Sequence, residues 1–478
     1  MLRRRIRAFC TAPVVEPPKP ARVISFDLPV TIDSTRLAER ERLRKRHLDA
    51  GVAKGLSHQI DDFFPTSLIS PQPETFSDSL KVKRPHLWLD SSASSSAGDT
   101  GRYWRYPREE LVGLLPEGLA GELSRDVFLM PSRTRDIGIM HRKATQEIMF
   151  QMGLMEGLGC VPKRGWLLEG KRGTGKSAIL TSVVAWARQR GWIVLFEPLG
   201  SRWGKEICEI TRSSTGVYLQ NDLAVQFLDR FLRFNRPMLQ ALPVNLSFYG
   251  RTAIDGSPIE TVERVYLPLI EKAVAEKNPS SISSRLEEVH RLRKMLKTPS
   301  MKDRLAVPTT VLDMCEFGIN NVAFATQAVA ELITQLKVQE AFPVLIALDE
   351  FNELFPVSEY VSTRYDNTSF NGYIPSYHLA LPRMLSRWDG HEFKRGLKLY
   401  ATTWNRRNRR QWDPTILGIK PEEIKQVRNF TKEEFAFYCA YQALTNTSHN
   451  FPQAKLEYFY MLTQGNGFEA RRIMATLY

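Results

Sequence analysis

The stretch that most constrains the fold of this chain lies at residues 166–178 and contains the pattern G-x-x-x-x-G-K-[ST]. An apolar run precedes the pattern and another follows it. This order predicts a strand, a glycine-rich loop and a helix, in which successive backbone N–H groups and the helix dipole face one anion. We therefore predict a phosphate-binding loop whose ligand contacts come from Gly170, Arg172, Gly173, Thr174, Gly175, Lys176, Ser177 and Ala178.

The residue types in this loop suit a polyphosphate and a magnesium ion. Lys176 would reach the β- and γ-phosphates, and the Ser177 hydroxyl would be one ligand of Mg²⁺. A second half of the site is predicted where the apolar run at 343–348 ends in Asp349 and Glu350. Asp349 would hold a water of the Mg²⁺, and Glu350 would orient or deprotonate an attacking water. The alternative is a strand that ends in two solvated acids.

The run at 396–403 predicts a further core strand. A polar residue after such a strand senses the γ-phosphate in ring-type and related ATPases, so Thr403 and Asn405 are candidates. Each is equally plausible as a strand cap.

Alternating helical and apolar segments from residue 103 onward predict an α/β fold with a doubly wound parallel sheet. The segments that surround the loop are a helix at 142–154, a helix at 178–189 and a strand at 192–196. Further helices are predicted at 219–234, 261–277, 283–296, 421–427, 431–445, 453–462 and 468–478. Thr431 and Glu434 form a capping-box pattern at the start of one of them.

Three regions follow from these segments. Residues 1–102 would hold a targeting segment, an extended basic arm and a Ser-rich linker, and residues 103–420 a nucleotide-binding domain with a helical insertion near 238–310. Residues 421–478 would form a helical lid, in which Arg471 and Arg472 are either lid arginines or surface charge.

The net charge of +14 is concentrated in two segments. Residues 1–54 hold thirteen Lys/Arg against six Asp/Glu, and residues 394–428 hold ten against three. This distribution favours a polyanionic partner, with nucleic acid ahead of acidic protein. Within the second segment an arginine cluster is bracketed by Trp404 and Trp412, which suits RNA, although a solvated loop is the common alternative. The cluster consists of Arg406, Arg407, Arg409 and Arg410.

Other classes of protein are disfavoured. No run approaches 18 apolar residues, which argues against a membrane span. Five scattered cysteines without a C-x-x-C pair argue against a disulfide framework and a zinc site. The first ten residues carry four arginines and no acid, which predicts mitochondrial import. A basic arm that stays on the protein and binds RNA is the alternative.

With these features in order, the chain resembles the death-associated protein three family of mitochondrial small-subunit ribosomal proteins. That family is a GTP-binding branch of the P-loop NTPases, related to the ring-forming ones (AAA+/STAND-like). The resemblance spans roughly residues 110–478. It is carried by residues 115–119 (LPEGL), 170–177, Trp192, Pro198, Trp203, 317–319, 325–329 and 348–349.

The resemblance implies a structural constituent of the mitochondrial small subunit that holds GTP or GDP with Mg²⁺, with ATP as the alternative nucleotide. Its partners would be the small-subunit rRNA, neighbouring ribosomal proteins and the large subunit. The competing hypothesis is a free-standing mitochondrial ATPase or GTPase switch that uses Glu350 catalytically. The sequence has no guanine-reading Asn-Lys-x-Asp motif, so the base stays open.

Overall fold

The computed structural model describes residues 87–89, 100–121, 136–158, 165–213, 217–250, 300–363, 370–403, 413–444 and 456–477. The amino-terminal arm, the helices predicted at 261–277 and 283–296, and the arginine cluster with Asn405 lie outside these residues. In the described part of the chain no helix is both long and apolar enough to cross a membrane.

A five-stranded sheet forms the centre of the fold, and each neighbouring pair of its strands is parallel. Three of these strands are buried along their whole length and consist mainly of apolar residues, with Glu197 and Lys398 as the charged exceptions, which is the pattern of a parallel sheet covered on both faces. The predicted α/β architecture is therefore confirmed. From one edge to the other the strands are β12 (Ile424–Gln426), β4 (Gly165–Glu169), β11 (Gly396–Ala401), β8 (Val344–Leu348) and β5 (Ile193–Glu197).

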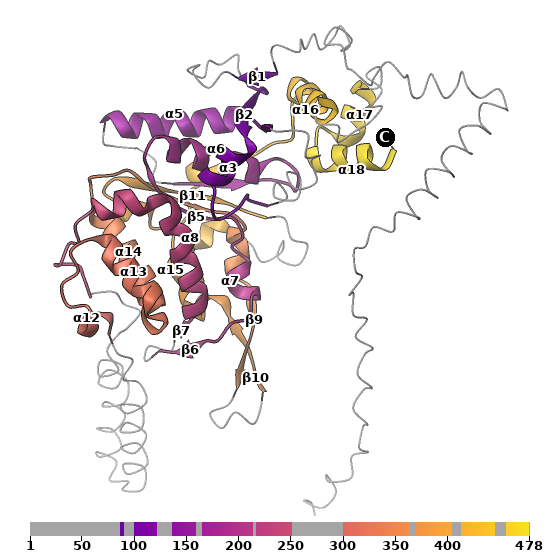
Figure 1. Cartoon of the computed structure of the whole chain (residues 1–478). Helices are drawn as coiled ribbons and strands as arrows, with labels where there is room; N and C mark the ends of the chain where they lie inside the picture. Colours follow the sequence, from indigo (N-terminus) through magenta and orange to yellow (C-terminus); the bar gives the residue numbers. More distant parts are fainter. Residues whose placement is uncertain are drawn as a thin grey trace, which may run out of the picture. The chain divides into compact units, whose positions relative to one another are not determined.

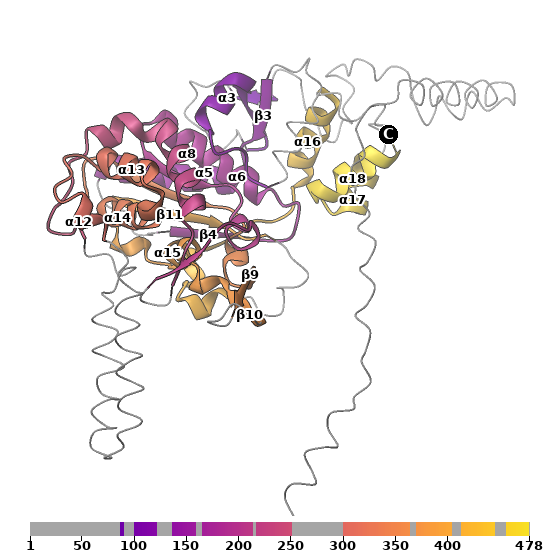
Figure 2. The ribbon, with the colours of Figure 1, turned by 60° about the horizontal axis from the view of Figure 1, so that its bottom comes forward.

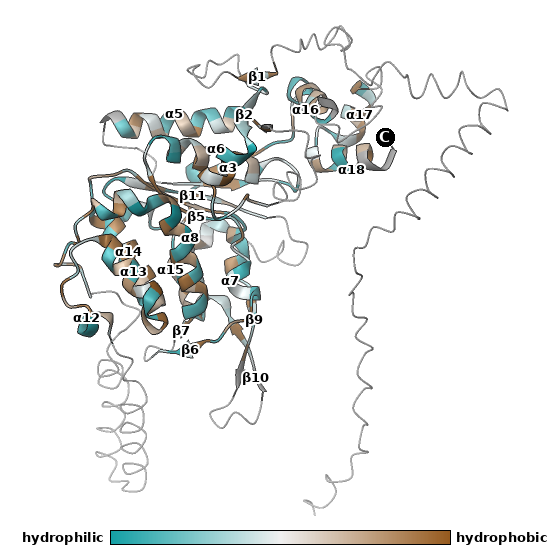
Figure 3. Ribbon diagram, viewed as in Figure 1, coloured by the Kyte–Doolittle hydropathy of each residue, from teal (hydrophilic) through white to brown (hydrophobic). Residues whose placement is uncertain are grey.

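Helices cover both faces of this sheet (Figure 1). Along β8, Val344, Ile346 and Leu348 belong to one hydrophobic core, whereas Leu345 and Ala347 belong to a second core on the opposite face. This alternation follows from the two-residue period of a strand. The first core is completed by α8 (Asn221–Gln240), α13 (Val311–Asn320) and α14 (Ala325–Val338), and the second by α3 (Arg108–Leu114), α5 (Lys143–Leu158) and α6 (Lys176–Gln189). Figure 3 shows the hydrophobic residues along α13 and α14.

A buried amide satisfies the free edge of the sheet at β5. The Asn235 side chain on α8 accepts a hydrogen bond from Val194 N at 3.0 Å and donates one to Val194 O at 3.0 Å. These backbone groups face away from β8 and would otherwise be buried without partners, which is costly. These two hydrogen bonds fix the position of α8 along β5.

The carboxyl-terminal helices α16 (Lys432–Leu444), α17 (Leu456–Thr463) and α18 (Gly467–Leu477) lie together in both views (Figure 1 and Figure 2). They share a third core with Tyr103 and Met140. The capping box at the start of α16 is confirmed, because Thr431 N donates to Glu434 Oε2 at 3.0 Å and Glu434 N to Thr431 Oγ1 at 3.2 Å.

The prediction of a helix at 421–427 is wrong. Residues Pro421–Glu423 form one 3₁₀ turn, and the chain then becomes strand β12, which pairs with β4 from Leu167 to Glu169. Proline followed by two acids is the usual start of a helix. Here the unpaired edge of β4 offered hydrogen bonds to an extended chain, and this tertiary interaction overrode the local signal.

Short elements complete the described fold. They are β1 (Trp88–Leu89), β2 (Tyr103–Pro107) and β3 (Asp136–Met140) in one small sheet, α7 (Arg202–Lys205), the pair β6 (Thr211–Arg212) and β7 (Tyr218–Leu219), α12 (Met301–Arg304), the hairpin β9 (Val357–Thr363) and β10 (Phe370–Pro375), and α15 (Ala380–Ser386).

Candidate functional site

The glycine-rich loop (residues 170–175) joins the end of β4 to the start of α6. Gly173 has φ +79° and Gly175, which precedes the first helical residue, has φ +90°. Residues other than glycine rarely adopt these backbone angles, so both positions need glycine. The strand, loop and helix predicted at this point are confirmed.

Ser177 and Asp349 meet although 172 residues separate them in sequence. The Ser177 hydroxyl donates to Asp349 Oδ2 at 2.5 Å, and Asp349 Oδ1 accepts from Glu350 N at 2.8 Å. Strands β4 and β8 flank β11 in the same direction, so their carboxyl ends lie at one edge of the sheet. This placement of the two halves of the motif is what the sequence predicted.

Lys176 is folded back over the loop. Its Nζ donates to Gly170 O at 2.8 Å and to Lys171 O at 2.9 Å. Burial lowers the pKa of Lys176 to about 8, and Asp349 opposes that shift. Burial likewise raises the pKa of Asp349 to about 6, although the hydrogen bond from Ser177 acts in the opposite direction.

The Lys176 ammonium and the Asp349 carboxylate are thus both buried at this edge of the sheet. Lys176 is 7% exposed and Asp349 is 2% exposed. Within the described residues neither forms an ion pair, and the hydrogen-bond partners of both are neutral groups. The two groups attract each other without a direct contact, and burying charges without a direct ion pair is costly. An anion beside Lys176 and a cation beside Asp349 would compensate these two charges.

Two glycines allow the backbone to close around these oxygens. A Cβ on Gly121, which has φ +58°, would stand 2.5 Å from Ser177 Oγ and 3.3 Å from Asp349 Oδ2. A Cβ on Gly200 would stand 2.6 Å from Asp349 O. Gly121 follows the 115–119 segment in sequence, and its place in the site was not predicted.

Glu350 adopts the left-handed conformation with φ +57°. Its carboxylate accepts a hydrogen bond from Ser201 N at 3.3 Å, which ties it to the chain after β5. Glu197, the last residue of β5, is a second buried acid, and burial raises its pKa to about 7. Sequence reasoning did not single out Glu197, which lies just beyond the strand predicted at 192–196 and is the last residue of the observed strand.

The other predicted residues take varied positions. The Arg172 guanidinium lies 4.0 Å from the centre of the Phe468 ring, on the side of α18. Thr403 exchanges backbone hydrogen bonds with the Asn352 side chain at 2.7 and 2.9 Å. Arg472 pairs with Glu469 on the surface of α18 at 2.8 Å. The roles of Arg172 and Thr403 toward a nucleotide stay predictions, as do those of Asn405 and the arginine cluster.

Among the described residues, Ser177 and Asp349 contribute oxygen atoms that could hold a metal ion. Ser177 Oγ and Asp349 Oδ2 are hard ligands of the kind that Mg²⁺ prefers, and Mg²⁺ keeps several waters and takes phosphate oxygens besides one or two protein ligands. No cluster of three or more His, Cys, Asp or Glu suited to a metal occurs among the described residues. The donor set therefore fits Mg²⁺ held jointly with phosphate.

Together the fold and the site define an α/β protein whose polar centre lies at the carboxyl edge of a parallel sheet. The family model of mitochondrial ribosomal death-associated protein 3 matches residues 139–448, which include both halves of the site and more than half of the chain. The chain belongs to this family. It is a small-subunit protein of the mitochondrial ribosome and works in the mitochondrial matrix. No curated protein matches the chain.

The close approach of Gly121 to Ser177 can be tested with a matched pair of substitutions. We expect Gly121→Ala to lower stability by about 1–3 kcal/mol more than Gly191→Ala, because an added methyl at 121 overpacks the site. Gly191 also has positive φ, at +74°, but nothing lies within 4 Å of its added Cβ. Both variants therefore carry backbone strain, and only one carries the clash. Equal unfolding midpoints in urea would contradict the close approach of Gly121.

Proposed function

We propose that this ribosomal protein is a P-loop nucleotide-binding protein that holds GTP or GDP with Mg²⁺ at the glycine-rich loop. ATP is the alternative nucleotide. The observation that carries the proposal is the burial of Lys176 and Asp349 with neutral hydrogen-bond partners, so that neither charge is compensated by a direct ion pair within the described residues. A polyphosphate beside Lys176 and a divalent cation beside Asp349 would compensate both at once.

The residues around the loop have separate parts in this proposal. The N–H groups of residues 173–178 and the α6 dipole would bind the phosphates, and Lys176 would leave Gly170 O and Lys171 O to reach them. Ser177 and Asp349 would hold the Mg²⁺, which would replace their direct hydrogen bond. The ion would supply charge neutralisation for the phosphates.

We infer that the nucleotide has a structural role and that turnover is not the function. The Glu350 carboxylate accepts a hydrogen bond from Ser201 N, so an attacking water would have to compete with this donor for the carboxylate. A free-standing ATPase or GTPase switch remains the second candidate, favoured by the position of Glu350 next to Asp349.

We also propose that the protein attaches to rRNA and neighbouring proteins through its basic segments. Within 394–428, Lys394 pairs with Glu340, Lys398 with Asp389, and Lys425 with Glu147. These pairs neutralise part of the segment within the chain itself, although only the Lys398–Asp389 pair is buried. The arginine cluster at 406–410 is then the strongest source of positive charge there for an external partner, together with the arm at 1–54.

The nucleotide site is tested by Lys176→Ala with Lys171→Ala as its control. Lys171 is exposed in the same loop, so its removal should leave binding nearly unchanged. We expect Lys176→Ala to be purified without nucleotide and to lose the stabilisation that the ligand provides, about 2.7 kcal/mol at 100 times its dissociation constant. Nucleotide content by chromatography and melting temperature measure this. A full complement of nucleotide in Lys176→Ala would refute the site.

Glu350→Gln separates the two candidate functions. If the nucleotide is structural, any hydrolysis rate should be the same in this variant and in the unaltered protein. The measurement is phosphate release under single-turnover conditions, with nucleotide affinity determined in parallel. A fall of about 100-fold or more with unchanged affinity, the size expected for loss of a general base, would establish the catalytic alternative.

The attachment proposal is tested by replacing Arg406, Arg407, Arg409 and Arg410 with Gln. We expect dissociation from the small subunit at lower salt, with the log–log salt slope reduced by about 0.7–0.9 for each RNA phosphate that the variant no longer binds. A control with Lys302, Arg304, Arg383 and Lys432 changed to Gln removes the same charge from exposed positions. An unchanged salt profile for the cluster variant in sedimentation would place attachment elsewhere.

A further inference from the structure

Three successive carbonyls of the glycine-rich loop are held from outside the site. Arg172 O accepts from Asn466 Nδ2 at 2.8 Å, Gly173 O from Gly467 N at 3.2 Å, and Thr174 O from Arg142 Nη1 at 2.5 Å. None of these donors belongs to the loop or to α6. They come from the segment before α5 and from the start of α18.

The geometry of the peptide bond converts these contacts into an orientation of the loop. In a trans peptide, the carbonyl of one residue and the N–H of the next point in opposite directions. Fixing the carbonyls of residues 172–174 therefore turns the N–H groups of Gly173, Thr174 and Gly175 away from the donors, toward the concave side of the loop. Parallel N–H dipoles repel one another, so this arrangement needs external support unless an anion lies among them.

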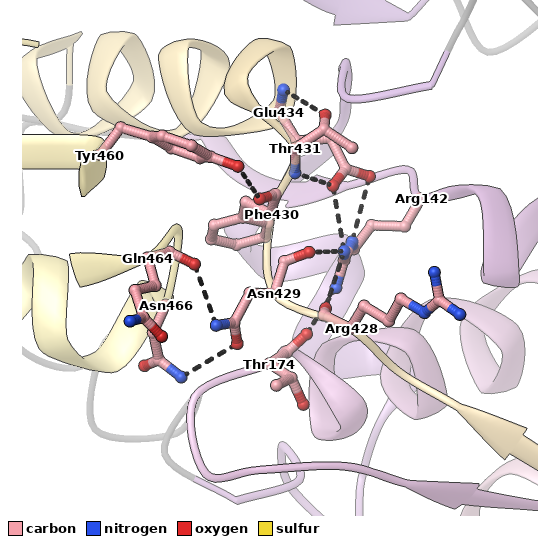
Figure 4. Close-up of polar contacts among 10 residues, drawn as sticks. All are labelled: Arg142, Thr174, Arg428, Asn429, Phe430, Thr431, Glu434, Tyr460, Gln464 and Asn466. Atoms are coloured by element: carbon pink, nitrogen blue, oxygen red, sulfur yellow. Dashed lines mark hydrogen bonds and ion pairs between the residues drawn. The ribbon is translucent and has the colours of Figure 1, made fainter. Parts of the chain in front are cut away.

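Arg142 provides such support with its whole side chain, which is shown in Figure 4. Besides Thr174 O, it donates to Glu434 at 3.0 and 3.2 Å and to the carbonyls of Arg428 and Asn429 at 3.1 and 3.2 Å. Residue 142 is 8% exposed. Because Glu434 belongs to the capping box of α16, Arg142 links the loop to the start of that helix.

The start of α18 also packs closely against the loop. A Cβ on Gly173 would stand 2.3 Å from Phe468 Cβ and 2.5 Å from Asn466 Oδ1. Asn466 Oδ1 also accepts from Phe468 N at 3.1 Å and from Glu469 N at 3.2 Å, which caps the helix. One side chain thus caps α18 with its oxygen and holds the loop with its nitrogen.

We propose that Arg142 and Asn466 are positioning residues that hold the glycine-rich loop in its anion-binding conformation and couple it to the carboxyl-terminal helices. This inference rests on the proposed nucleotide site. Coupling of this kind is reciprocal: phosphate in the loop strengthens the hold on α16 and α18, and an ordered α18 strengthens phosphate binding. Whether the site holds a ligand thereby determines how firmly α16 and α18 are held in place for contact with ribosomal neighbours.

The test measures GDP–Mg²⁺ affinity by calorimetry and amide exchange of residues 456–477 with and without the ligand. We expect Arg142→Ala to weaken affinity about tenfold or more, since a buried charged donor to the loop is removed. Arg142→Lys should recover only part of it, because an ammonium cannot reproduce the planar fork. Ligand should slow exchange in α18 of the unaltered protein and have little effect in Arg142→Ala.

Two further variants separate positioning from fold stability. Asn466→Ser keeps a good helix cap but loses the donor to Arg172 O, so it should weaken affinity without lowering the melting temperature much. Tyr460→Phe removes only the hydrogen bond to Phe430 O at 3.3 Å, in the same junction, and should leave affinity unchanged.

The outcomes distinguish the two proposals. If the unaltered protein binds GDP–Mg²⁺ and both Arg142→Ala and Asn466→Ser bind it equally well, the positioning role is overturned and the nucleotide site stands. If Arg142→Ala does not fold, Asn466→Ser decides. If the unaltered protein binds no nucleotide, the proposed function fails and this inference fails with it.

Discussion

The hydrogen bond between Ser177 and Asp349 is the interaction on which the rest of the site depends. It exists because β4, β11 and β8 run parallel and end at one edge, which brings together two segments 172 residues apart. A buried carboxylate is poorly compensated by a hydroxyl and one backbone N–H, which are the partners of Asp349 here. A cation shared with phosphate would satisfy the same oxygens more fully.

The surroundings of this bond bring the backbone close to it. Gly121 and Gly200 approach the Ser177 and Asp349 oxygens at distances that no other residue type would allow. On the far side of the loop, Arg142 and Asn466 bind its carbonyls. The loop is therefore held between the central sheet and the carboxyl-terminal helices, an arrangement suited to retaining a ligand in a protein of the ribosomal small subunit.

Much of the fold was predictable because its signals are local. The glycine-rich loop, the buried run of β8 and the capping box at Thr431 each depend on a few neighbouring residues, and each prediction is confirmed. The helix at 421–427 was predicted wrongly for the same reason, since Pro421 and its two acids resemble a helix start whereas pairing with β4 is a distant interaction.

The rest of the fold and of the site could not be predicted, because it depends on contacts between residues that are distant in sequence. Arg142 follows a short strand and gives no local sign that it will reach residues 174 and 434. Asn235 looks like a polar interruption in α8 until the edge of β5 is placed against it. Gly121 lies just after the LPEGL segment, and this position is the clearest indication of its role that the sequence contains.

Calorimetry of the unaltered protein tests the central claim, the compensation of Lys176 and Asp349 by phosphate and metal, most directly. The protein, freed of any retained ligand, is titrated with GDP, GTP and ATP in the presence of Mg²⁺ and again in the presence of a chelator. The account predicts saturable binding of one nucleotide per chain that is clearly tighter with Mg²⁺. No heat of binding at millimolar nucleotide, or an affinity indifferent to Mg²⁺, would contradict it.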